Sequence, residues 1–337
     1  MLGGRIINKF GLQMSLLKPY KVLLILGNGF DLSLNLPTSY RKFLESDLFS
    51  KNVNRIHYHN GKIDQHDRNL FNYLTEQKRL NEWIDVEEEL MKYASNQRVE
   101  YHNMKGGILS CPNTSDEQIK ASYSILCFAL QTYMASLDYS VIKKDALSLQ
   151  LLETIIRHKQ NSIVSFNYTD LANLVKGKIK SNVEYIHGNI KRGIILGFQR
   201  FENMALGYEY MIKSENVLYK SCHLSSKMLE ADEVIIFGHS LGVTDHCYFQ
   251  KFFDAQTRDN ALPKKITIIT LDRDSRKKIV QQMVNLSNKK YQLFLDNTDV
   301  NVIETKNNKD SYFQFVKDLD QLLKQGRFYS LFHSNKA

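Results

Sequence analysis

Two residues whose side chains could take part in catalysis, an asparagine and a histidine, each follow a short apolar run. Asn167 follows SIVSF, and His187 follows VEYI and precedes Gly188. Histidine is the side chain whose pKa suits proton transfer near neutral pH. An asparagine amide offers both a donor and an acceptor, which can fix a water molecule or a sugar hydroxyl. We therefore predict proton transfer beside a bound ligand, with a structural role as the alternative for His187.

Two glycine-containing turns follow other apolar runs. They are Gly27-Asn28-Gly29-Phe30-Asp31, after KVLLIL, and Gly238-His239-Ser240, after EVIIF. Without Cβ, glycine lets a phosphate approach the amides of a following helix N-terminus, where the dipole favours an anion. We expect such contact at both turns, whereas turn and cap roles are the alternative for His239 and Ser240. Asp31 is expected either to cap the following helix or to bind a ribose hydroxyl.

Six short apolar runs are predicted to be strands that are buried on both faces, because they do not alternate with polar residues. They are residues 21–26, 162–166, 183–186, 233–238, 265–271 and 291–295. Helical patterns separate several of them, so we predict an α/β fold with a parallel, doubly wound sheet. Ligands bind at the carboxyl edge of such sheets. The polar strand ends, including Thr169 beside Asn167, are therefore predicted to form one site.

The region from about residue 45 to 158 has no predicted strand. It contains four helical windows, at 67–80, 81–96, 116–139 and 145–159, and in the second Trp83, Val86, Leu90 and Tyr93 share one face. We expect the neighbouring acidic residues to be a solvated helix face, with a site role for Asp85 or Glu87 as the alternative. The predicted organisation is an N-terminal extension (1–18), a nucleotide-binding domain (19–46 and 159–330) and an all-helical insertion (47–158). For the segment 193–220, a lid over the site and an ordinary connection are both open.

The composition is typical of a globular protein without a zinc module, a disulfide framework or a membrane-spanning segment. The chain has 337 residues, of which 43% are hydrophobic and 24% charged, as in ordinary globular proteins. Its net charge of +9 is spread along the chain, which is consistent with an acidic partner or with a solvated surface. Its four cysteines form no CxxC pair, so we expect neither a zinc module nor a disulfide framework, and no bound metal. The apolar runs are too short to cross a bilayer, and a signal peptide is not indicated, so we expect a cytoplasmic protein.

The order of the motifs resembles the sirtuin series. Its elements here are Gly27-Asn28-Gly29 with Leu36-Pro37, Asn167, His187-Gly188, and Gly238-His239-Ser240-Leu241-Gly242-Val243. The stretches GNGFDLSLNLPTSYRKFL, SFNYTD, YIHGNI, IFGHSLGVTDHCYF and WIDVEEEL more closely resemble the abortive-infection AbiH family, a sirtuin-like branch linked to phage defence. The resemblance extends from about residue 21 to 255.

This resemblance implies a Rossmann-like pocket for NAD and hydrolysis of NAD to nicotinamide and ADP-ribose. Gly27 and Gly29 would face the pyrophosphate, Asn167 would lie by the nicotinamide ribose, and His187 would be the base. Gly238 and Ser240 would line the adenosine side. A phage-derived trigger and a homo-oligomer are also expected as partners.

The chain departs from the sirtuin pattern in three ways. The sirtuin Asn-x-Asp is Asn167-Tyr168-Thr169 here, so a hydroxyl replaces a carboxylate, and the Ala and Ser of GAGxS are replaced by Asn28 and Asp31. The zinc-binding CxxC pairs of the protein deacylases are absent, which favours turnover of a free nucleotide.

Two other functions are open alternatives. An adenine-nucleotide sensor without turnover is favoured by Thr169 in place of the sirtuin carboxylate. Nucleic-acid binding is suggested by the positive charge but ranks lower, because the sequence lacks a stacked-aromatic motif, a recognition helix and a metal-carboxylate cluster.

Overall fold

A computed structural model describes most of the chain. The described residues are 19–53, 58–59, 62–63, 69–81, 84–95, 100–102, 108–110, 117–175 and 178–325. The expected N-terminal extension and Trp83 lie outside them. Within these ranges every helix is too short or too polar to cross a membrane.

The centre of the molecule is a six-stranded sheet in which all neighbouring strands are parallel. In spatial order the strands are β12 (Thr298–Glu304), β11 (Lys264–Thr270), β10 (Glu233–Phe237), β1 (Val22–Leu26), β6 (Ser162–Ser165) and β7 (Asn182–Tyr185). Five of the six predicted strands are confirmed, with ends that differ by one residue at most. The predicted parallel α/β sheet is therefore confirmed.

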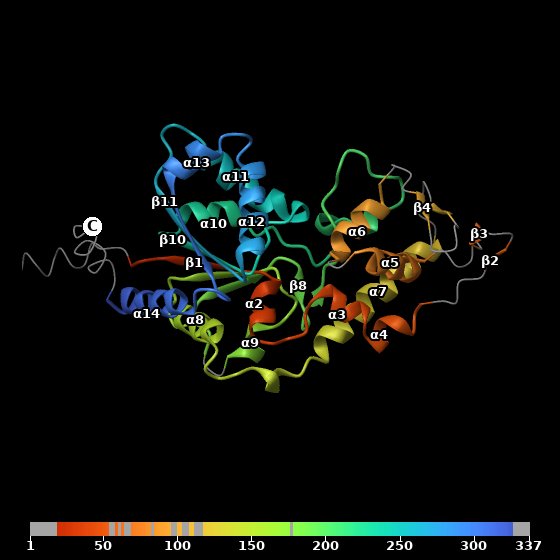
Figure 1. Ribbon diagram of the computed structural model, residues 1–337, viewed down its shortest axis with the longest axis horizontal. Helices are drawn as coiled ribbons and strands as arrows, with labels where there is room; N and C mark the ends of the chain where they lie inside the picture. Colours follow the sequence, from red (N-terminus) through yellow and green to blue (C-terminus); the bar gives the residue numbers. More distant parts are fainter. Residues whose placement is uncertain are drawn as a thin grey trace, which may run out of the picture.

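Helices cover both faces of the sheet (Figure 1). Leu24 and Leu26 of β1 point to an apolar cluster that includes α8 and α14, whereas Leu23 and Ile25 point to a second cluster with α10 to α13. The helices around the sheet are α2 (Asn28–Ser33), α8 (Leu147–Ile156), α9 (Leu171–Leu174), α10 (Leu224–Glu230), α11 (His246–Gln256), α12 (Arg273–Leu286), α13 (Tyr291–Asn297) and α14 (Lys309–Gln325). Because both faces are covered, every residue of β1 is buried. We call this part the sheet lobe.

The predicted strand at 291–295 is wrong, because these residues form helix α13. Tyr291, Phe294 and Leu295 are spaced by three and four residues, which places them on one helix face against the second cluster. The sixth strand is β12, which follows directly. Its residues alternate in burial because it lies at the edge of the sheet.

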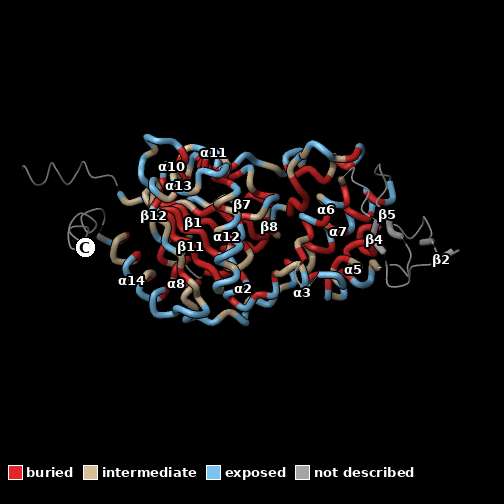
Figure 2. Tube along the Cα trace, turned by 45° about the horizontal axis from the view of Figure 1, so that its top comes forward, coloured by how far each residue is buried: buried red, intermediate tan, exposed pale blue. Residues whose placement is uncertain are grey.

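A second body, the helical lobe, lies beside the sheet (Figure 1). Its helices are α3 (Tyr40–Leu44), α4 (Asp47–Ser50), α5 (Leu70–Leu80), α6 (Val86–Tyr93) and α7 (Glu117–Ala135), and they share one apolar core with residues of the segment 194–212. Figure 2 shows buried chain in both lobes. Val86, Leu90 and Tyr93 are buried in this core, as their spacing predicts.

The predicted insertion is not all-helical. It contains two short antiparallel pairs, β2 (Tyr58–His59) with β3 (Lys62–Ile63) and β4 (Glu100–His102) with β5 (Ile108–Ser110). Pairs of two and three residues are too short to give a periodic signal in the sequence. Helix α8, from the end of the predicted insertion, packs in the core of the sheet lobe. The division of the chain at residues 47 and 158 stays a prediction.

Short elements connect the two lobes. They are the antiparallel pair β8 (Gly188–Asn189) and β9 (Gly193–Ile194), and the 3₁₀ helices η2 (Tyr139–Val141), η3 (Glu209–Met211) and η4 (Lys213–Glu215). A further 3₁₀ helix, η5 (Val243–Asp245), lies between β10 and α11 in the sheet lobe. The segment 193–220 was predicted to be either a lid over the site or an ordinary connection. It begins with β9, which forms a hairpin with β8. Phe198, Tyr208 and Met211 of this segment are fully buried in the helical lobe.

Candidate functional site

The predicted strand-end residues converge at the carboxyl edge of the sheet. The Nδ2 atom of Asn167, after β6, donates a hydrogen bond of 3.1 Å to the carbonyl oxygen of Gly27, after β1. The ring of Phe166 lies between two histidines, with ring centroids 4.1 Å from His239 and 5.4 Å from His187. Loops that are far apart in the sequence therefore meet at one place.

The glycines of the two turns allow the turns to approach each other closely. The amide of Gly29 donates to the carbonyl oxygen of Gly238 at 2.9 Å, and the amide of Gly27 donates to Phe237. A Cβ atom on Gly238, whose φ is +64°, would lie 2.3 Å from the amide nitrogen of Phe30. These two glycine amides are thus already bonded to backbone oxygens. Phosphate contact at the turns stays a prediction.

Other residues of the first turn also have partners within the protein. The Oδ1 atom of Asn28 accepts a hydrogen bond of 2.6 Å from Thr38. Phe30 is buried and packs edge-on against Phe237, with ring centroids 5.2 Å apart. A direct contact of Phe30 with a ligand is not indicated by this position, because its ring lies in the apolar core.

The prediction that Asp31 caps the following helix is wrong. Helix α2 has Gly27 at its N-cap, and Asp31 is the fourth helical residue. Its Oδ2 atom accepts a hydrogen bond of 2.9 Å from the hydroxyl of Thr169, and its Oδ1 atom has no partner among the described residues. Burial raises the pKa of this carboxyl to about 7. Asp31 and Thr169, two residues that depart from the sirtuin pattern, are therefore in contact.

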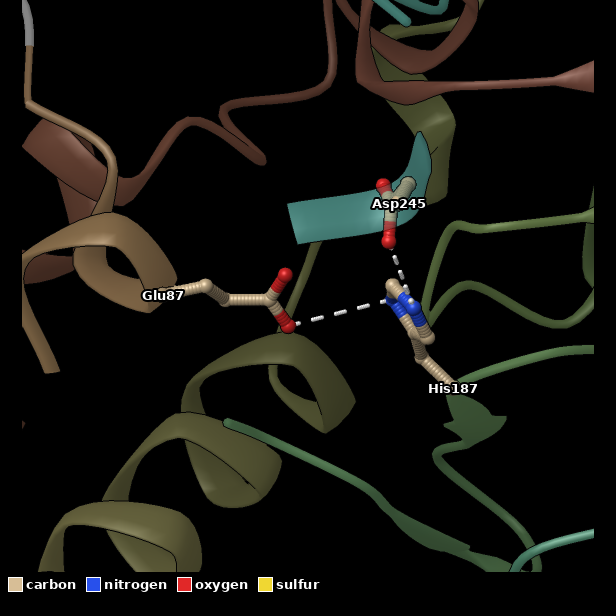
Figure 3. A group of neighbouring side chains, drawn as sticks. All are labelled: Glu87, His187 and Asp245. Atoms are coloured by element: carbon tan, nitrogen blue, oxygen red, sulfur yellow. Dashed lines mark ion pairs between the residues drawn. The ribbon is translucent and has the colours of Figure 1, made fainter. Parts of the chain in front are cut away.

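His187 belongs to a buried cluster of ionisable side chains, and Figure 3 shows three of its members, Glu87, His187 and Asp245. Glu87 comes from α6, Lys213 from η4 and Asp245 from η5. The Nζ atom of Lys213 lies 2.7 Å from Oε2 of Glu87, 3.0 Å from Nε2 of His187 and 3.2 Å from Oδ1 of Asp245. The exposed fraction of the Lys213 residue is 0%, and that of His187 is 4%. The cluster thus joins the two lobes in a place without contact to bulk water.

The ammonium group determines the direction of these hydrogen bonds. An ammonium has three N–H donors and no acceptor. Its three neighbours are two carboxylate oxygens and one ring nitrogen, so Nε2 of His187 accepts, and in the neutral ring the proton lies on Nδ1. The Nδ1 atom lies 3.8 Å from Oε1 of Glu87, which is beyond hydrogen-bond distance.

Burial and charge both affect the pKa values in the cluster. Burial, and then the ammonium of Lys213, lower the pKa of His187 to about 4. Burial opposes ionisation of Asp245, but Lys213 and His187 hold the pKa of Asp245 well below its usual range. Burial also opposes the charge of Lys213, but the carboxylates of Asp245 and Glu87 raise the pKa of Lys213. Burial raises the pKa of Glu87 to about 8, although Lys213 opposes this rise. His187 is therefore neutral near pH 7 beside an Asp245–Lys213 ion pair.

Glu87, His187 and Asp245 also form a set of possible metal ligands, because one ligand atom of each lies within 4.8 Å of the others. Two carboxylates and an imidazole suit several divalent ions. Lys213, however, places a positive charge within 3.2 Å of an atom of each residue. The ammonium and a metal ion cannot share this space, so a metal could enter only if Lys213 left.

The second predicted turn contributes one residue to the cluster. The Nε2 atom of His239 lies 3.4 Å from Oδ2 of Asp245, and its Nδ1 atom accepts a hydrogen bond from the amide of Leu241. Its neighbour Ser240 is exposed. The helix expected after this turn begins at His246, preceded by η5.

Three members of the cluster were not expected from the sequence as principal site residues. The solvated acidic face predicted for α6 is wrong for Glu87 and Glu89, which are buried, whereas Glu88 is exposed. Asp85 is the N-cap of α6 and accepts hydrogen bonds from two backbone amides. Lys213 and Asp245 carry no local sequence signal of these contacts.

Comparisons with known proteins identify the family. No curated protein matches the chain. The family model for bacteriophage abortive infection AbiH matches residues 23–263, which is well over half of the chain and includes all the side chains of the cluster. The chain therefore belongs to the bacteriophage abortive infection AbiH family.

Proposed function

We propose that this protein acts in antiphage abortive infection by hydrolysing NAD to nicotinamide and ADP-ribose at the carboxyl edge of its sheet. Membership of the AbiH family supports the role in abortive infection. The position of His187 carries the proposal for the reaction. Its neutral ring lies at the edge where the glycine turns and Asn167 meet, in contact with a carboxylate that can stabilise a proton on it.

The order of the strands supports a dinucleotide as the ligand. Counted along the chain, the spatial order β7-β6-β1-β10-β11-β12 is 3-2-1-4-5-6. This is the order of Rossmann-like folds, whose dinucleotides bind in the crevice where the strand order reverses. In this chain the strand order reverses between β1 and β10, which are the strands that precede the two glycine turns. A sirtuin-like arrangement is consistent with the same order.

The reaction breaks the bond between C1′ of the ribose and the nicotinamide nitrogen. The bonding electrons leave with this nitrogen, so nicotinamide departs neutral and needs no acid. Charge develops on the ribose as an oxocarbenium ion, as in glycoside hydrolysis. A water oxygen then bonds to C1′, and the water proton passes to Nε2 of His187 and on to solvent. Asn167 would orient the water or a ribose hydroxyl.

Nε2 of His187 must first exchange its partner. It accepts a hydrogen bond from Lys213, so the water or hydroxyl has to take the place of the ammonium. The exposed fraction of His187 is 4%, and a dinucleotide would enter only after the surrounding segments move. The structure thus corresponds to a resting state of the proposed enzyme.

The test is release of nicotinamide by purified wild type and His187→Ala. General-base help contributes roughly 10²–10⁴ in rate, so we expect a loss of this size with nucleotide binding largely retained. His158→Ala, a histidine after the end of α8, is the matched control and should keep full activity. Equal rates for wild type and His187→Ala would rule out the assignment of His187.

An adenine-nucleotide sensor without turnover is the second candidate. The hydrogen bond from Lys213 to Nε2 of His187 favours it, because a base whose acceptor nitrogen is occupied takes no proton. This candidate would show saturable binding of an adenine nucleotide without release of nicotinamide over hours.

A further inference from the structure

We propose that Lys213 is a positioning residue that keeps His187 unprotonated, with the proton of the neutral ring on Nδ1 and with Nε2 as the accepting nitrogen. This proposal rests on the proposed function, in which His187 is the base, and concerns the regulation of that residue. No motif places Lys213 in the site. Its assignment depends on the contacts of its fully buried side chain.

The first argument is the number of donors and acceptors. Lys213 lies within hydrogen-bond distance of Glu87, His187 and Asp245, which matches the three protons of an ammonium. The Nε2 atom also lies 3.3 Å from Oδ1 of Asp245. A proton on Nε2 would nevertheless face the closer ammonium and would remove one of its three acceptors. In a buried site such a lost hydrogen bond is costly. The contact with Lys213 therefore selects one tautomer of His187.

The second argument is the balance of charge around the ring. The titratable and charged groups that face it are Glu87 of α6, Lys213 of η4, Asp245 of η5, His239 after β10, Tyr168 after β6 and Tyr248 of α11. Burial raises the pKa of both tyrosines, which are neutral. Lys213 is thus the permanent cation of this group. Without it, the ionised Asp245 would face the ring with no counter-charge, and the imidazolium ion would be favoured.

The two arguments together define what Lys213 does for the reaction. A histidine that is already protonated cannot accept a proton from water. Lys213 keeps the ring neutral while it occupies the accepting nitrogen. When a water or ribose hydroxyl replaces it there, Nε2 is ready to accept, and Lys213 retains its contacts with Glu87 and Asp245. The lysine thus acts through His187 and does not touch the reacting atoms in this arrangement.

The experiment is nitrogen NMR of the full chain labelled with [¹⁵N]histidine. The His187 signals are assigned by their disappearance in His187→Gln. In wild type near pH 7 we expect the chemical shifts of a ring protonated on Nδ1, with no titration between about pH 5.5 and 8. In Lys213→Met we expect the His187 midpoint to rise by about two pH units, because the Asp245 carboxylate then stabilises the imidazolium without a competing cation. Lys213→Arg restores a cation with several donors and should keep the midpoint low.

Lys220→Met is the matched control, because Lys220 is exposed in the same connecting segment, and it should leave His187 unchanged. An unchanged midpoint in Lys213→Met would overturn the proposal. If that variant does not fold, wild type decides alone, since a proton on Nε2 or a midpoint near the usual value for histidine contradicts the proposal. The NMR readout needs no turnover. Absence of nicotinamide release with the expected tautomer would therefore reject the proposed function and leave the assignment of Lys213 in place.

Discussion

The Nζ atom of Lys213 lies 3.0 Å from the Nε2 atom of His187, and both side chains are buried between the lobes. Lys213 and Glu87 are attached to the helical side of the molecule, whereas His187 and Asp245 follow strands of the sheet. One hydrogen-bonded cluster therefore links the candidate base to the packing of the two lobes. Access to His187 and the arrangement of the lobes are expected to change together.

The cluster should make a large contribution to stability when one partner is removed. Lys213→Met leaves the buried Asp245 carboxylate without a cation, and breaking a buried pair in this way costs about 3–5 kcal/mol. We expect a loss of this size in the free energy of unfolding, measured with urea. The double variant Asp245→Asn/Lys213→Met should recover part of it, because the uncompensated carboxylate is gone. A loss below about 1 kcal/mol for Lys213→Met would contradict the burial of the charge.

The contact between the glycine turns predicts a backbone effect. Gly238→Ala places a Cβ 2.3 Å from the amide nitrogen of Phe30, at a φ of +64°. The φ angle alone costs about 1–3 kcal/mol for a residue other than glycine, and the clash adds to this. The control is Gly242→Ala, whose Cβ would meet only the Ser240 hydroxyl, at 3.4 Å. Thermal unfolding should show a clear drop for Gly238→Ala and little change for Gly242→Ala, and equal changes would speak against a close contact of the turns.

Asp31 predicts a dependence of stability on pH. Burial raises the pKa of this carboxyl from 3.8 to about 7 in the folded protein. Its protonated form favours folding, so its contribution is complete below about pH 4 and is lost as the pH rises through about 7. Each unit by which the pKa is higher in the folded than in the unfolded chain changes the free energy of unfolding by about 1.4 kcal/mol between low and high pH. Asp31→Asn removes this loss, and its stability relative to wild type should increase from pH 5 to pH 8.

The control for this prediction is Asp299→Asn, which changes an exposed carboxyl on β12. The free energies of unfolding of the three proteins are compared at each pH. A constant difference between Asp31→Asn and wild type from pH 5 to pH 8 would show that Asp31 is ionised throughout, as an ordinary carboxyl is.

The sheet was largely predictable because its strands carry a strong local signal. The runs VLLIL and EVIIF are apolar on both faces, and helices cover both faces of the sheet. YQLFL failed because a five-residue apolar run fits one turn of a buried helix as well as a strand. The edge strand TDVNVIE was missed because its polar residues Asp299 and Asn301, which are exposed, interrupt the apolar run.

The site was predictable only where the chemistry lies at a strand end. Asn167 and His187 directly follow strands, so the carboxyl-edge rule brings them together without coordinates. The roles of Lys213 and Glu87 arise from a contact between residues that are 126 positions apart. Neither residue carries a strong local signal of its role. Such a pair requires the packing of two lobes, which no local pattern encodes.

The most direct test of NAD hydrolysis in abortive infection is the NAD content of phage-infected cells that carry wild type or His187→Ala at matched abundance. Chromatography of cell extracts should show that NAD falls after infection with wild type, that nicotinamide rises, and that NAD persists with His187→Ala. An unchanged NAD content in cells that wild type protects, or an equal fall with His187→Ala, would contradict NAD hydrolysis by this site.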